Sequence, residues 1–114
     1  MGLPNPPLSG YRLMWQFVMF DLPVQTKPQR HAATAFRKWL LDQGYEMSQF
    51  SVYIRLCVGK EQAARRTRDI RRAAPVTGTV QVLLVTDTQF AQMVTLSKGR
   101  RRNSSGSLSQ LALF

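Results

Sequence analysis

The chain has 114 residues, and its 16 Lys and Arg against 6 Asp and Glu give a formal net charge of +10. This length makes a single domain, and an apolar content of 44% excludes disorder along the whole chain. One cysteine, Cys57, excludes an intramolecular disulfide framework and any multi-cysteine metal site.

The sequence predicts neither a membrane span nor an export signal. The longest apolar run, 13–20, is much shorter than the roughly 20 residues that cross a bilayer. Residues 1–10 lack a basic and then apolar signal pattern, and their prolines predict a flexible leader outside the fold. We therefore expect a cytoplasmic protein that does not enter a membrane.

The first two predicted elements are a strand and a helix. Residues 12–20 are apolar on both alternating faces, which is typical of a central strand covered on both sides, and the strand is expected to end at Asp21. The segment 26–43 predicts a helix, because Thr26 and Gln29 have the spacing of a capping box. Its apolar face is expected to consist of Ala32, Phe36, Trp39 and Leu40.

The next segments predict two strands, a helix and a strand. Residues 45–57 are rich in aromatic and β-branched side chains, and the interruption at 48–51 indicates two short strands joined by a tight turn. A second helix is expected over 60–74 and the clearest strand over 79–86. The thin buried stripe of this second helix is expected to consist of Ala63, Thr67, Ile70 and Ala74.

The order strand, helix, strand, strand, helix, strand predicts an α+β fold of the ferredoxin-like βαββαβ type, with both helices on one face of an antiparallel sheet. Trp15 and its neighbours make the first strand apolar on the face that the helices leave uncovered, and further apolar segments follow at 93–96 and 108–114. Both features suggest that the open face of the sheet meets another chain, most simply a second copy.

Positive charge is concentrated in the second predicted helix. Arginine grips phosphate in a bidentate fork, so this density favours a nucleic-acid partner, bound through phosphates without regard to base sequence. The alternative is an ordinary solvated helix face. The candidate phosphate-binding residues of this helix are Arg65, Arg66, Arg68, Arg71 and Arg72.

Asp21 is the best candidate for metal-dependent chemistry, because it follows a buried strand and precedes a proline turn. Hydrolysis of a phosphodiester by Mg²⁺ needs carboxylate oxygens. The alternative is a turn residue that accepts hydrogen bonds from backbone amides, and Asp87 is a second candidate carboxylate. His31 is expected to be solvated and Cys57 to be a buried, inert thiol.

Four strings of residues, in order and on the expected elements, resemble a known family. They are 20–23 (Phe-Asp-Leu-Pro), 36–41 (Phe-Arg-Lys-Trp-Leu-Leu), 44–53 with its Ser-Gln-Phe-Ser-Val-Tyr ending, and 86–90 (Thr-Asp-Thr-Gln-Phe). Together they are similar to the second of the two universal CRISPR-associated spacer-acquisition proteins, in the form that accompanies type II systems. The resemblance covers residues 11 to 114.

This resemblance implies a ferredoxin-like face-to-face homodimer with an extra C-terminal strand that crosses onto the partner. It also implies a complex in which the dimer bridges the integrase, the first spacer-acquisition protein, and captures duplex DNA. Some members are Mg²⁺-dependent endonucleases on RNA or double-stranded DNA; Asp21 matches their metal ligand, with one Mg²⁺ shared across the dimer. Lys27 and Arg30 lie where the family places basic residues near the phosphate backbone.

The expected domain organisation is a leader at 1–10, a ferredoxin-like domain at 11–97, and a basic linker with a C-terminal strand at 98–114. That strand is expected to bind the partner copy or the integrase by strand addition, with a frayed terminus as the alternative. Its candidate contact residues are Leu108, Leu111, Leu113 and Phe114.

The leading functional hypothesis is a DNA-binding scaffold in spacer acquisition with weak catalysis or none. A stand-alone Mg²⁺-dependent endonuclease that uses paired Asp21 carboxylates is the second hypothesis, and single-stranded RNA is an alternative substrate to duplex DNA. A generic RNA-binding ferredoxin-like module is the third, although the aromatic signature of RNA-recognition modules is missing.

Overall fold

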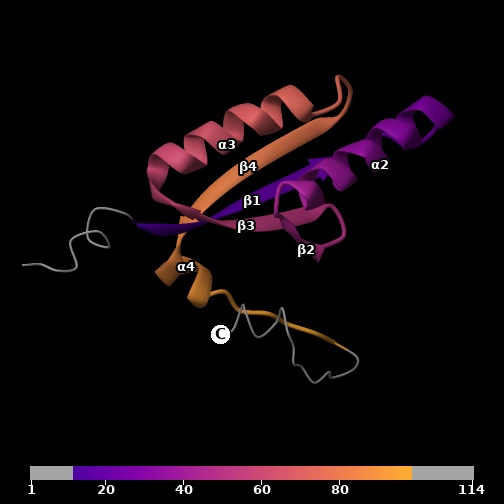
Figure 1. The fold of residues 1–114 in the computed structure, drawn as a ribbon. Helices are drawn as coiled ribbons and strands as arrows, with labels where there is room; N and C mark the ends of the chain where they lie inside the picture. The colour runs from indigo at the N-terminus through magenta and orange to yellow at the C-terminus, as the bar shows by residue number, and fades with distance from the viewer. Residues whose placement is uncertain (1–11, 99–114) are drawn as a thin grey trace, which may run out of the picture.

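The computed structural model describes residues 12–98, and the expected leader at 1–10 and expected C-terminal strand at 108–114 lie outside this part. The fold consists of one sheet with helices on both of its faces (Figure 1). In chain order the elements are β1 (Leu13–Asp21), α2 (Lys27–Asp42), β2 (Glu46–Gln49), β3 (Val52–Val58), α3 (Gly59–Ala73), β4 (Thr79–Thr86) and α4 (Asp87–Ala91).

The four strands form an antiparallel sheet in the order β2-β3-β1-β4. The two long helices, α2 and α3, lie on one side of this sheet and the short α4 lies on the other (Figure 1). This arrangement confirms the ferredoxin-like α+β prediction. Among residues 12–98, no helix is long and apolar enough to cross a membrane.

The predicted boundaries agree with the structure to within a residue or two. Thr26 caps α2 and makes the predicted capping box with Gln29, and β4 has the predicted bounds. The predicted interruption at 48–51 is shorter in the structure, because β2 extends through Gln49 and only residues 50 and 51 form the turn, where Ser51 adopts a positive φ of 68°.

The apolar face of α2 differs by one position from the prediction. Ala33 is buried with Phe36 and Leu40, Trp39 is partly buried, and Ala32 is exposed. Residues three and four apart share one face of a helix, and 33, 36 and 40 follow that spacing. Ala32 therefore lies to the side of the core, where it faces the space between α2 and α3.

The core lies between the sheet and the two long helices. On α3 the predicted stripe is confirmed in part, since Ala63 and Ile70 are buried whereas Thr67 and Ala74 are only half-buried. The central cluster of buried side chains consists of Val18, Phe20, Phe36, Leu40, Tyr45, Tyr53 and Ile70.

Candidate nucleic-acid interface and metal-binding carboxylate

The open face of the sheet, opposite α2 and α3, carries the odd-numbered side chains of β1 with their neighbours on β3 and β4. The register places Trp15 beside Leu56 and Phe17 beside Leu83. Leu83 is 50% exposed and Leu56 is 39% exposed. This apolar surface confirms the expectation that the helices leave one face of the first strand uncovered.

The short helix α4, which the sequence analysis did not predict, covers one end of the open face. Thr86 and Gln89 form a capping box at its start. Phe90 stacks on Trp15 with 4.4 Å between ring centroids, and the Trp15 indole N–H donates to Asp87 Oδ1 over 2.9 Å. Asp87, considered above as a second metal ligand, is therefore engaged in holding α4 against the sheet.

Asp21 is the last residue of β1 and pairs with Thr79 of β4. It continues the alternation that places Phe17 and Met19 on the open face, and it is exposed. No cluster of three or more potential metal-binding His, Cys, Asp or Glu side chains occurs within residues 12–98. A single chain therefore offers a cation one carboxylate at this end of the sheet.

Lys27 and Arg30 lie in the first turn of α2, shortly after Asp21, and both are exposed. The Arg30 guanidinium donates from one nitrogen to the carbonyls of Val24 and Gln25, each over 3.1 Å. Arg30 thus fixes the loop that follows Asp21. Lys27 forms neither of the two ion pairs found among the described residues.

The arginines of α3 are not equivalent. Arg65, Arg68, Arg71 and Arg72 are exposed, as a phosphate-binding surface requires. Arg66 is half-buried, and its Nε atom is buried without a hydrogen-bond partner among the described residues. Arg66 therefore flanks the exposed face rather than belonging to it, and its role in phosphate binding stays a prediction.

A buried polar side chain joins α3 to the sheet. Gln16, only 1% exposed, donates through Nε2 to the Ala63 carbonyl over 3.1 Å and to Thr67 Oγ1 over 2.9 Å. Its Oε1 accepts from the Tyr45 hydroxyl over 2.5 Å. These bonds determine where α3, and so its arginines, sits on the sheet. The signal in the sequence was the lone amide within an apolar strand.

Burial also changes the acidity of two groups in this region. Desolvation raises the pKa of Tyr45 to about 12 and raises the pKa of the Cys57 thiol. Cys57 is fully buried and is not in a disulfide, which confirms the expectation that this thiol is buried. His31 is exposed, as expected.

A family model for the CRISPR associated protein Cas2 matches residues 14–93, almost all of the described region. The chain belongs to the Cas2 family. This membership confirms, at the level of the family, the resemblance drawn from the four sequence strings, and the type II form stays a prediction. The candidate contact residues Leu108, Leu111, Leu113 and Phe114 lie outside the described residues, and their role stays a prediction.

Similarity to individual Cas2 proteins extends over most of the chain. A protein of Paracidovorax avenae named CRISPR-associated endoribonuclease Cas2 is 45% identical over 94% of this chain and 99% of its own length. A Flavobacterium psychrophilum protein of the same name is 46% identical over 75% of each chain. A crystal structure of Cas2 covers 82% of this chain and 99% of its own, with a TM-score of 0.52 at 18% identity, which supports the fold alone.

Proposed function

We propose that the chain acts in CRISPR spacer acquisition, in the cytoplasm, as a homodimeric DNA-binding scaffold that bridges copies of the integrase. The observation that carries this proposal is the exposed apolar open face on a sheet whose opposite face holds an arginine-rich helix. Membership of the Cas2 family supports the CRISPR context. The scaffold role is supported by the placement of the apolar open face and the arginine-rich helix on opposite sides of the sheet.

A second copy of the chain is the best-matched occupant of the open face. The exposed side chains there, such as Leu56, Val58 and Leu83, are apolar and belong to β3 and β4, the two strands that flank β1. Two such sheets can bury these side chains face to face, and a twofold axis makes one surface serve both partners. The arginine helices then remain on the outside of the dimer.

The exposed arginines of α3 support binding to phosphates. Arg65, Arg68 and Arg72 are spaced three and four residues apart, so they share one side of the helix. Contacts of this type fix the position of a duplex but carry no information on its sequence. The dimer is therefore expected to bind duplex DNA of any sequence and to release it as salt rises.

Asp21 fits the role of a Mg²⁺ ligand. Its side chain is exposed and forms neither of the ion pairs of the described region, so both oxygens are available. Mg²⁺ sites in proteins often use one or two carboxylates and several waters, and a face-to-face dimer supplies two copies of Asp21. When bound, the ion would polarise a phosphoryl oxygen and activate water for hydrolysis.

Endonuclease activity is the second candidate function, with RNA as the substrate that the names of the relatives favour. Asp21 would hold the ion in this activity, and Lys27 would lie near the phosphate backbone. The two candidates are compatible, because the proposed DNA-binding arginines and the carboxylate occupy different parts of the fold.

The dimer is tested by Leu83→Glu, with Val76→Glu as the matched control. Leu83 lies on the open face, whereas Val76 is fully exposed in the loop between α3 and β4. Light scattering during size exclusion should give a dimer for the parent and the control, and a monomer for Leu83→Glu with weaker binding of duplex DNA. A parent chain that stays monomeric at tens of micromolar, or a dimer that survives Leu83→Glu, contradicts the proposal.

A further inference from the structure

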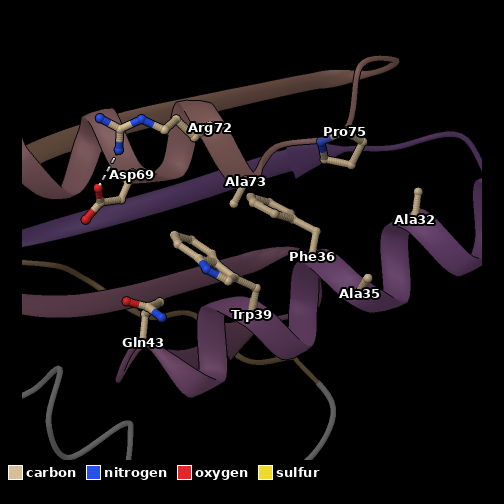
Figure 2. A pocket seen from close by; sticks show the side chains of 9 residues that line it. All are labelled: Ala32, Ala35, Phe36, Trp39, Gln43, Asp69, Arg72, Ala73 and Pro75. Carbon is tan, nitrogen blue, oxygen red and sulfur yellow. Dashed lines mark hydrogen bonds and ion pairs between the residues drawn. The ribbon is translucent and has the colours of Figure 1, made fainter.

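A groove lies between α2 and α3 on the helix-covered side of the sheet, away from the open face (Figure 2). Its volume is about 730 Å³. The groove is wide because small side chains line it on both helices. The residues that define it are Ala32, Ala35, Phe36 and Trp39 of α2 with Arg72 and Ala73 of α3.

One wall of the groove is aromatic. The rings of Phe36 and Trp39 are nearly parallel, at 8°, with 6.2 Å between their centroids. Figure 2 shows both rings pointing from α2 toward Ala73 on α3. Phe36 is buried in the core, whereas Trp39 is only partly buried. Part of the indole is therefore available to a ligand in the groove.

The opposite wall brings positive charge to the same space. Arg72 is 71% exposed and is held by Asp69 over 2.9 Å, so the carboxylate fixes the guanidinium at the rim. The surrounding helices are strongly basic: α3 has six basic residues against two acidic ones, and α2 has four against one. Asp69 also lines the groove and pairs with Arg72, so the lining itself is close to neutral, and the excess positive charge comes from the rest of the two helices. That excess favours an anionic occupant at the rim of the groove.

We infer that this groove binds an unpaired nucleotide, whose base stacks on Trp39 and whose phosphate meets Arg72. Stacking of bases on aromatic side chains near a basic surface is a general mode of single-strand recognition, and it tolerates any base. The neighbouring Gln43 side chain also lines the groove and presents an amide that can donate to or accept from a base edge.

The inferred site is separate from Asp21 and goes beyond the proposed function. It adjoins the arginine surface of α3, because Arg72 belongs to both. A strand that separates from a duplex bound along α3 would reach the groove without leaving the basic surface. An acidic amphipathic peptide is the competing occupant, but it uses only the charge and apolar area of the groove, not the planar indole of Trp39.

The matched test pair is Ala32→Glu and Thr34→Glu. Both positions are exposed on α2, but only Ala32 lines the groove, so both variants change the net charge equally. The probes are a hexanucleotide that contains 2-aminopurine, whose fluorescence falls on stacking, and a blunt DNA duplex. Ala32→Glu should weaken hexanucleotide binding about fivefold or more relative to Thr34→Glu, and the two variants should bind the blunt duplex equally.

Trp39 variants test the stacking itself. Trp39→Phe should keep most of the quenching and affinity, whereas Trp39→Leu should lose about as much affinity as Ala32→Glu does. Because Trp39 also packs against the core, thermal unfolding checks that Trp39→Leu is folded. If Trp39→Leu is unfolded, the comparison of Ala32→Glu with Thr34→Glu decides the outcome.

The inference is overturned if the parent does not bind the hexanucleotide, or if Ala32→Glu and Thr34→Glu bind it equally. It is also overturned if an acidic amphipathic peptide, and not the hexanucleotide, shows the Ala32→Glu defect. Duplex binding without hexanucleotide binding contradicts this inference but leaves the proposed function intact. Hexanucleotide binding without duplex binding contradicts the proposed function but leaves this inference intact.

Discussion

The Tyr45 hydroxyl donates a hydrogen bond to Gln16 Oε1, and the two oxygens are 2.5 Å apart beneath the arginine helix α3. Through its nitrogen, Gln16 also binds the Ala63 carbonyl and the Thr67 hydroxyl of that helix. A fully paired polar group in an otherwise apolar interior specifies one arrangement of its neighbours. The position of α3 on the sheet is therefore set by directed bonds as well as by packing.

Replacing Gln16 by Leu should destabilise the protein by about 2 kcal/mol, because the buried Tyr45 hydroxyl loses its acceptor. Urea unfolding of the parent and the variant measures the difference. Gln25→Leu is the matched control, since Gln25 is exposed in the loop before α2, and its effect should stay within about 0.5 kcal/mol.

The coupling between the two residues can be measured directly with Tyr45→Phe. The double variant Gln16→Leu with Tyr45→Phe should be less destabilised than the sum of the single variants, by about 1 kcal/mol, because it leaves no orphaned hydroxyl. Additive effects in this cycle would show that the 2.5 Å contact contributes nothing specific.

Stability should fall at high pH because of Tyr45. Burial raises its pKa to about 12 from an ordinary 10, so between these values the unfolded chain binds fewer protons than the native one. The contribution of the neutral phenol is complete below pH 10 and is lost as pH rises toward 12. The parent should lose about 1 kcal/mol more than Tyr45→Phe between pH 9 and pH 11, measured by urea unfolding.

The raised pKa of the Cys57 thiol acts in the same direction, but it is present in both proteins and largely cancels in this comparison. Equal pH dependence of the parent and Tyr45→Phe would mean that Tyr45 ionises in the folded protein as it does in the unfolded one.

Replacing Arg65, Arg68 and Arg72 by Ala should make DNA binding less sensitive to salt. Each lost phosphate contact reduces the slope of log affinity against log salt by about 0.9. The triple variant should therefore lose roughly 2 to 3 units for each protomer whose α3 contacts the duplex. Fluorescence polarisation of a labelled duplex at several salt concentrations measures the slope. Lys38→Ala, a neutralised exposed cation on α2, should change it by less than about 1 unit, and an unchanged slope in the triple variant would remove α3 from the interface.

Asp21→Asn should abolish metal-dependent cleavage and leave the fold and the affinity for duplex DNA unchanged. Asp21 is exposed at the end of β1, so its stability effect should stay within about 0.5 kcal/mol. The matched control is Asp42→Asn, an exposed carboxylate at the end of α2, which should keep full activity. If the scaffold role dominates, spacer acquisition in cells should continue in Asp21→Asn; its loss would favour the enzymatic role.

Most of the fold could be predicted from the sequence, because the local capping signals and the hydrophobic periodicity indicated the same helices and strands. The capping box at Thr26, the alternation in 12–20 and the β-branched run in 79–86 each predicted an element that the structure contains. These are short-range patterns, which depend on a residue and its immediate neighbours along the chain.

Features that depend on tertiary contacts could not be predicted in this way. The partial burial of Arg66 and the exposure of Ala32 depend on how each helix is rotated on the sheet. The helix α4 has only five residues and is held by Phe90 and Asp87 against Trp15, a partner more than seventy positions away. The groove beside Trp39 likewise exists only because α2 and α3 are brought together.

The backbone around Asp21 is fastened on both sides. Phe20 donates its N–H to the Ser51 carbonyl, Asp21 pairs with Thr79, and Arg30 ties down the segment that follows. A divalent cation that binds there would restrict only a few side-chain torsions, because the main chain has already lost its conformational entropy during folding. Affinity at this carboxylate should therefore respond to the second copy of Asp21 far more than to the length or composition of the adjoining loop.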